Sequence, residues 1–112
     1  MRTSELEGAA LDWAVGYAQC LEVVNYNPIT ARDLMSAAIL NGMASPSTDW
    51  AQGGPIIERE RIGLKWLDGV SLWEAESAYY PTMHGPTPLI AAMRCYVASR
   101  LGDEVELPEG LK

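Results

Sequence analysis

The dipeptide Asp68-Gly69 constrains the fold more than any other feature of this sequence. It separates two runs rich in alternating apolar residues, 62–67 and 70–77. Asp-Gly is typical of the two-residue turns that close β-hairpins, because their central positions need a positive φ. We therefore expect an antiparallel hairpin at about residues 62–77.

A two-residue turn also fixes the register of this hairpin, and the register assigns each side chain to a face. Leu67 would stand opposite Val70, and side chains alternate between faces from there. One face then collects the apolar residues Ile62, Leu64, Trp66, Trp73 and Ala75. A hairpin alone is marginally stable, so helices must cover this face. A third strand is expected from Val23-Val24 or from residues 105–107.

Three stretches have the apolar spacing of amphipathic helices. The first follows Ser4 and Glu7, which are spaced as in a capping box. The second, residues 30–41, has a helical composition but only a short apolar stripe. The third begins after Thr87 and ends at Gly102, with Arg94 off its buried stripe.

Residues 45–58 combine helix-start chemistry with residues that interrupt helices. Ser47 is placed as an N-cap, and Asp49 would then complement the positive end of the helix dipole. Proline inside a helix costs roughly 3 kcal/mol. We therefore expect either a bend at Pro55 or a second helical start there.

The same stretch holds candidate contact residues. Trp50 and Ile57 recur at helical spacing and are expected to share one buried face. Gly53 and Gly54 permit close approach of a neighbouring helix or of a ligand, and helix packing is the favoured interpretation. The loop expected at residues 78–86 adds Tyr79 and Tyr80, in a composition typical of core rims and of interfaces.

The whole chain, residues 1–112, is expected to form a single domain with an acidic extended tail from about residue 103. At this length one core is large enough without disulfides or metals. The patterns together predict an α+β fold, with three or four helices packed on a small antiparallel sheet built around the hairpin at about 62–77.

Charge and cysteine usage limit the partners. The net charge is −7, from 15 acidic and 8 basic residues. This balance argues against direct nucleic-acid binding, which needs clustered Lys and Arg. Cys20 and Cys95 form no metal-ligand spacing, so no metal or cofactor is expected. No signal peptide or membrane span is apparent, and the host-cell cytoplasm is the expected location.

Ser47, Asp49 and His84 are the residue types of a catalytic triad. No G-x-S-x-G nucleophile elbow surrounds Ser47, and both Ser47 and Asp49 already have expected capping roles. His84 has no local partner that would make it a general base or a metal ligand. Cys95 beside Arg94 is interpreted as a small buried hydrophobe rather than a reactive thiol.

Three runs of the sequence, residues 8–15, 45–60 and 85–99, resemble the NinX-like family of small phage and prophage proteins of unknown function. More distantly, Leu11-Asp12 followed by Ser47-Thr48-Asp49 is similar to phage α/β/α sandwich domains. The resemblance implies a helix after Thr48 and helices packed on a small sheet, and it assigns no catalytic residue.

The favoured function is therefore that of a phage or prophage accessory protein, non-enzymatic, which binds a host or phage protein as a monomer or a homodimer. Its candidate binding residues are Trp50, Gly53, Gly54, Tyr79 and Tyr80. One alternative is a small hydrolase-like enzyme with its site at the Ser47–Gly54 bend near His84. A weaker alternative is an acidic mimic of nucleic acid.

Overall fold

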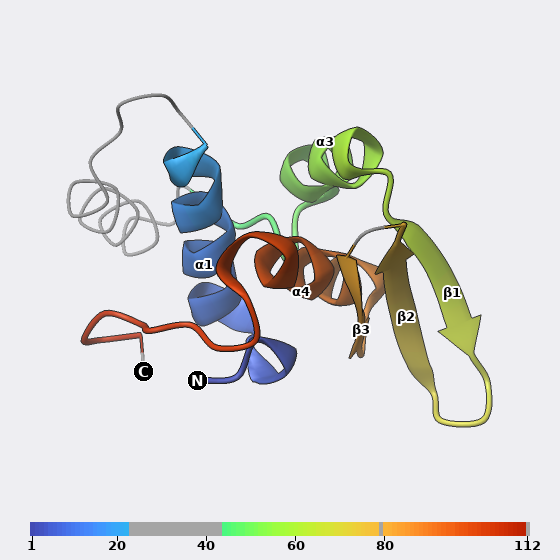
Figure 1. Ribbon diagram of the computed structural model, residues 1–112. Helices are drawn as coiled ribbons and strands as arrows, with labels where there is room; N and C mark the ends of the chain where they lie inside the picture. The colour runs from blue at the N-terminus through green and yellow to red at the C-terminus, as the bar shows by residue number, and fades with distance from the viewer. Residues whose placement is uncertain (23–43, 79, 112) are drawn as a thin grey trace.

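The computed structural model, which describes residues 1–22, 44–78 and 80–111, has an α+β architecture (Figure 1). The described α-helices are α1 (Gly8–Leu21), α3 (Trp50–Glu60) and α4 (Pro88–Leu101), preceded by a short 3-10 helix, η1 (Thr3–Glu5). The described strands β1 (Gly63–Leu67), β2 (Leu72–Ser77) and β3 (Tyr80–Gly85) form an antiparallel sheet in the order β1-β2-β3. The helix expected at 30–41 and the strand expected at Val23-Val24 lie outside the described residues.

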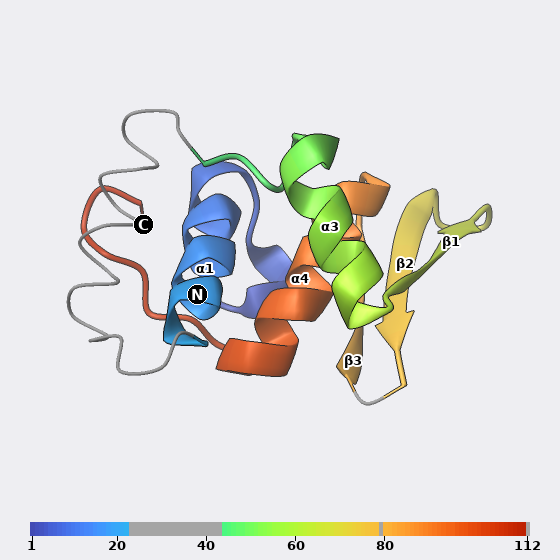
Figure 2. The ribbon, with the colours of Figure 1, turned by 90° about the horizontal axis from the view of Figure 1, so that it is seen from above.

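Helix α4 is the centre of the fold. It contacts η1, α1, α3 and all three strands. In both ribbon views α1 lies on one side of α4 and the sheet on the other, while α3 packs across it (Figures 1 and 2). Consequently α4 is buried on nearly every side, from Ala91 to Ala98 without interruption.

The predicted boundaries of α4 are confirmed. The Thr87 hydroxyl accepts a hydrogen bond from the backbone N–H of Ile90 at 3.1 Å, and Pro88 follows in the first turn. Gly102 ends the helix with a φ of 86°, a conformation that glycine adopts without steric cost. The prediction that Arg94 stands off the buried stripe is wrong, because its side chain is only 8% exposed.

The hairpin has a different register from the one predicted. Leu67 pairs with Leu72 and Trp66 with Trp73, so four residues, 68–71, connect the strands. Ser71 adopts the positive φ, 53°, that the turn needs. The register moves by two residues, and an even shift leaves every side chain on its predicted face. Trp66 and Trp73 therefore still lie on the same face, with ring centroids 5.5 Å apart.

The expectation of a loop at 78–86 is wrong, because most of this segment is β3. Its pairing with β2 places Met83 opposite Ala75, and both side chains are buried. Pro81 is tolerated within β3, because β3 is an edge strand of the described sheet, where a missing N–H costs no hydrogen bond to a neighbouring strand.

Residues 105–107, proposed as a third strand, do not join the described sheet, and Val105 pairs instead with the start of the chain. Val105 and Met1 exchange backbone hydrogen bonds of 2.9 and 3.0 Å, and Arg2 forms a bridge with Glu104. Val105 and Leu107 are buried, so the acidic tail is extended but packed against the core.

The capping box expected at Ser4 and Glu7 does not form. Residues 3–5 make the separate helix η1, and α1 begins at Gly8, whose φ is +57°. Glu7 occupies the N-cap position without a side-chain cap. The positive φ at Gly8 lets the chain change direction between η1 and α1.

Helix α3 also starts later than predicted, with Asp49 rather than Ser47 as its N-cap. It continues through Pro55 as one helix, so a second helical start at that proline is not found. The later start alters the buried face, which holds Gly53 and Ile56, whereas Trp50 is 53% exposed. The prediction that Trp50 and Ile57 share a buried face is therefore wrong for Trp50.

Candidate functional site

The turn before α3 is joined to α1 by a buried polar contact. The backbone N–H of Ser47 donates to Oδ1 of Asp12 at 2.8 Å. Burial raises the pKa of the Asp12 carboxyl, and hydrogen bonding from Ser47 opposes that rise. Ser47 is 2% exposed, and its Oγ makes no hydrogen bond of normal geometry to any described residue.

The Asp49 carboxylate is occupied within its own turn. Its Oδ1 accepts from the backbone N–H of Ala51 at 2.9 Å, and its Oδ2 accepts from Nε2 of Gln52 at 3.1 Å. Gln52 in turn accepts from the backbone N–H of Ser45 at 2.9 Å. These bonds close the turn and hold the first residues of α3.

A cavity of about 220 Å³ lies where the starts of α3 and α4 meet. Ser47, Thr48 and Trp50 line it from one side, and residues 87–90 line it from the other. The two helices approach closely here, since a Cβ added at Gly53 would lie 2.5 Å from Cδ1 of Leu89. Gly53 therefore serves the packing of α3 on α4.

The triad candidates do not share one cavity. His84 is exposed on β3, pairs with Glu74 of β2 and lines a different cavity, of about 270 Å³. Ser47 Oγ makes no hydrogen bond to His84 or to Asp49. The described geometry thus gives Ser47 neither His84 as a general base nor Asp49 as an orienting carboxylate, so the predicted triad does not form.

Tyr80, a candidate binding residue, belongs to a hydrogen-bonded ion cluster that sequence reasoning missed. Its hydroxyl donates to Oε1 of Glu60 at 3.2 Å, and Nη2 of Arg100 donates to the same oxygen at 2.6 Å. Arg100 also pairs with Glu22, which accepts from the Tyr96 hydroxyl at 3.0 Å. Arg100 was visible in the sequence only as a basic residue in the last turn of a helix. Tyr79 lies outside the described residues.

The charges of this cluster stabilise one another. Burial acts to raise the pKa of Glu60, but hydrogen bonds from Arg59, Arg100 and Tyr80 outweigh it and lower the pKa. For Tyr96, burial and the adjacent Glu22 carboxylate raise the pKa of the phenol. Arg100 also lies over the Tyr80 ring, 5.5 Å from its centroid. The cluster joins α1, α3, β3 and α4, which favours a structural role.

Exposed aromatic side chains gather at the hairpin and at the start of α3. Trp66 is 42% exposed, and its indole Nε1 donates to the Asp68 carboxylate at 2.5 Å. Trp73, its partner across the hairpin, stands opposite Gly85, and a Cβ added at Gly85 would lie 3.0 Å from Cγ2 of Ile90.

Ile90 and Trp50 then line the same cavity. We call the four residues Trp50, Trp66, Trp73 and Ile90 the tryptophan strip. Trp66 contacts Trp73, Ile90 lies beside Gly85, which stands opposite Trp73, and Ile90 lines one cavity with Trp50.

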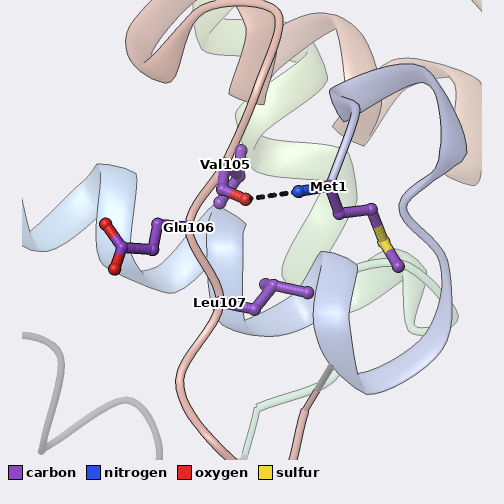
Figure 3. Close-up of a pocket in the computed structure, with 4 residues that line it drawn as sticks. All are labelled: Met1, Val105, Glu106 and Leu107. Atoms are coloured by element: carbon purple, nitrogen blue, oxygen red, sulfur yellow. Dashed lines mark hydrogen bonds between the residues drawn. The ribbon is translucent and has the colours of Figure 1, made fainter.

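Another cavity, of about 370 Å³, lies beside the packed tail and is lined by Met1, Val105, Glu106 and Leu107. Figure 3 shows the Met1 nitrogen donating to the Val105 carbonyl, while the Glu106 carboxylate points away from Met1. The lining is mostly apolar and carries no arrangement of groups suited to catalysis within the described part of the chain.

The described residues contain neither a cluster of metal ligands nor a membrane-spanning helix. No group of three or more His, Cys, Asp or Glu side chains within residues 1–22, 44–78 and 80–111 is placed to hold a metal ion. None of the helices in these ranges combines the length and apolar character needed to cross a bilayer.

Comparison with known proteins identifies the family. No curated protein matches the chain. The family model described as bacteriophage P22 NinX matches residues 2–100, which include every described helix and strand except the last residue of α4. The chain therefore belongs to the phage P22 NinX family.

Proposed function

We propose that this phage-family protein is a non-enzymatic accessory factor that acts by binding another protein in the host-cell cytoplasm. The tryptophan strip is the single observation that carries the proposal. It contains three of the four tryptophans of the chain, and Trp50 and Trp66 are about half exposed. Tryptophan is highly buried on average and is enriched among the residues that dominate binding energy at protein interfaces.

The strip has features of a binding surface besides its exposure. The Trp66 indole is held by Asp68 and by contact with Trp73, which limits the side-chain entropy lost on binding. The cavity beside Trp50 offers a recess of about 220 Å³ for a partner side chain. Acidic net charge favours a protein partner over a nucleic acid.

The test uses the substitutions Trp50→Ala and Trp66→Ala. Tagged wild-type and variant chains are compared for the host or phage proteins that they retain, measured by quantitative mass spectrometry. The matched control is Leu21→Ala, which removes an exposed apolar side chain from α1, on the opposite side of α4 from the sheet. We expect a partner to be lost from both tryptophan variants and retained by the control.

Sedimentation equilibrium of the same four proteins identifies a homodimer. If the partner is a second copy, both tryptophan variants sediment as monomers while the wild type and Leu21→Ala sediment as dimers. Retention of the same partners and the same mass by all four proteins would contradict the proposal.

A further inference from the structure

Arg94, on the central helix α4, has an incomplete set of partners. Its Nε donates to the Leu6 carbonyl and its Nη1 donates to the His84 carbonyl, both at 2.7 Å. Nη2 makes no hydrogen bond to any described residue, and no described Asp or Glu forms an ion pair with the guanidinium. The side chain is nevertheless only 8% exposed.

This environment is costly for a cation. Most of the Arg94 side chain is removed from water, and two neutral carbonyls replace only part of the lost hydration. Nη2 is not among the fully buried unpaired atoms of the described residues, so it remains open to solvent or to a ligand. Arginine does not escape the cost by deprotonating, because its guanidinium stays charged in proteins. Glu7 attracts the Arg94 charge without forming an ion pair with it. An anion bound at Nη2 would supply the missing counter-charge.

A cavity of about 270 Å³ is present beside this cation. Arg94 lines it together with Ser4 of η1 and with Thr82 and His84 of β3, and the remainder of the lining comes from β2 and β3. Hydroxyl and imidazole groups donate hydrogen bonds to oxyanions, and a guanidinium binds phosphate or carboxylate through its paired N–H groups. Glu74, which pairs with His84 across the sheet, does not line the cavity.

We propose that this cavity binds a small oxyanion, a phosphate or a carboxylate, with Nη2 of Arg94 as the principal donor. The hydroxyls of Ser4 and Thr82 and the imidazole of His84 complete the set of donors. The site lies among η1, β3 and α4, so its occupation would also link the start of the chain to the edge of the sheet. It is independent of the tryptophan strip.

The experiment is an NMR titration of the full ¹⁵N-labelled chain with inorganic phosphate and, separately, with succinate. Sodium chloride keeps the ionic strength constant, because screening alone alters exposed charges. We expect saturable shifts at the Arg94 Nε–H and at the amides of Ser4, Thr82 and Gly85. Saturation by phosphate alone, or by succinate alone, assigns the class of oxyanion.

Substitutions decide whether the shifts report this site. We expect Thr82→Val and His84→Ala, which alter exposed side chains, to weaken binding about 2- to 10-fold, the effect of one hydrogen bond. We expect Arg94→Met to abolish binding. The control Arg61→Met removes an exposed positive charge elsewhere and should leave the affinity unchanged.

Two results would overturn the proposal. One is the absence of saturable shifts with either anion at concentrations that fill a millimolar site. The other is equal affinity in the wild type, Thr82→Val and His84→Ala. Because these two variants retain Arg94 and its hydrogen bonds to Leu6 and His84, the test remains decisive even if Arg94→Met does not fold.

Discussion

The backbone N–H of Ser47 donates to the buried carboxylate of Asp12 across 2.8 Å, and this contact joins the turn before α3 to helix α1. Loss of the acceptor would leave a buried N–H without a partner, at a cost of about 1–3 kcal/mol. We expect Asp12→Ala to lower the free energy of unfolding by that amount, measured by urea denaturation at pH 7. Asp12→Asn is the control, since its amide oxygen still accepts the hydrogen bond. Equal losses in both variants would contradict this role for the Ser47 N–H.

The contact between Asp12 and Ser47 also predicts that the stability of the protein depends on pH. Burial raises the folded-state pKa of Asp12 above the ordinary value of 3.8, so the folded protein binds this proton more tightly than the unfolded chain does. Ionisation of Asp12 therefore weakens folding as pH rises through the interval between the two pKa values. We expect the wild type to gain stability relative to Asp12→Asn as pH is lowered from 7 towards 3.8. A relative loss on acidification would show that the Ser47 hydrogen bonding outweighs burial.

Two adjacent glycines in α3 should respond to alanine in opposite directions. A Cβ at Gly53 would lie 2.5 Å from the Pro46 carbonyl and from Cδ1 of Leu89, and overpacking of this kind costs about 1–3 kcal/mol. A Cβ at Gly54 would meet only the Trp50 ring, at 4.0 Å. We therefore expect Gly53→Ala to destabilise the protein and Gly54→Ala to stabilise it by about 0.4–1 kcal/mol through chain entropy. Urea denaturation of both variants measures the difference, and effects of the same sign would contradict the close packing at Gly53.

Glu60 holds the ion cluster between α3, β3 and α4. Its side chain is 7% exposed and accepts hydrogen bonds from Arg59, Tyr80 and Arg100. Hydrogen bonds to charged groups contribute about 1.5–3 kcal/mol, and we expect Glu60→Gln to cost that much at pH 7. Glu58→Gln, at an exposed position of the same helix, should change stability by less than about 0.5 kcal/mol.

The pH dependence of Glu60 has the opposite sign to that of Asp12. The folded-state pKa of Glu60 is lowered from its ordinary value of 4.5, so its stabilisation is complete above that value and is lost as pH falls through the folded pKa. We expect the difference between the wild type and Glu60→Gln to shrink below pH 4.5. A difference that is constant from pH 7 to acid would exclude a charge-dependent role for Glu60.

Local chemistry explains which parts of the fold were predicted. The residues that flank helix α4 indicate its start and its end, because Thr87 caps it and Gly102 terminates it. Helix α1 could be placed from its apolar spacing, although its start depends on η1 and Gly8 rather than on the expected capping box. Signals that act over three or four residues are readable without tertiary information.

The errors arise where contacts distant in sequence decide the outcome. Strand β3 exists because it pairs with β2 and packs on α4, whereas residues 78–86 taken alone were expected to form a loop. Arg94 appeared to be a surface residue, yet carbonyls from Leu6 and His84 hold it in the interior. Ser47 was assigned to a helix cap, whereas its N–H is taken by Asp12, 35 positions away. No periodicity within one element encodes these contacts.

The hairpin turn allows the predicted and observed registers to be distinguished directly. In the two-residue turn expected from Asp68-Gly69, the glycine would need a positive φ. In the structure Gly69 has no positive φ and no neighbouring atom within 4 Å of an added Cβ, whereas Ser71 has a φ of 53°.

We therefore expect Gly69→Ala to change the free energy of unfolding by less than about 0.5 kcal/mol, the usual range for surface substitutions. Ser71→Gly should stabilise the protein, because glycine relieves the strain of a left-handed residue, which is about 1–2 kcal/mol for other side chains. Urea denaturation of both variants tests the register. A large loss of stability in Gly69→Ala, with no gain of stability in Ser71→Gly, would instead support the two-residue turn. In that register Trp66 does not stand opposite Trp73.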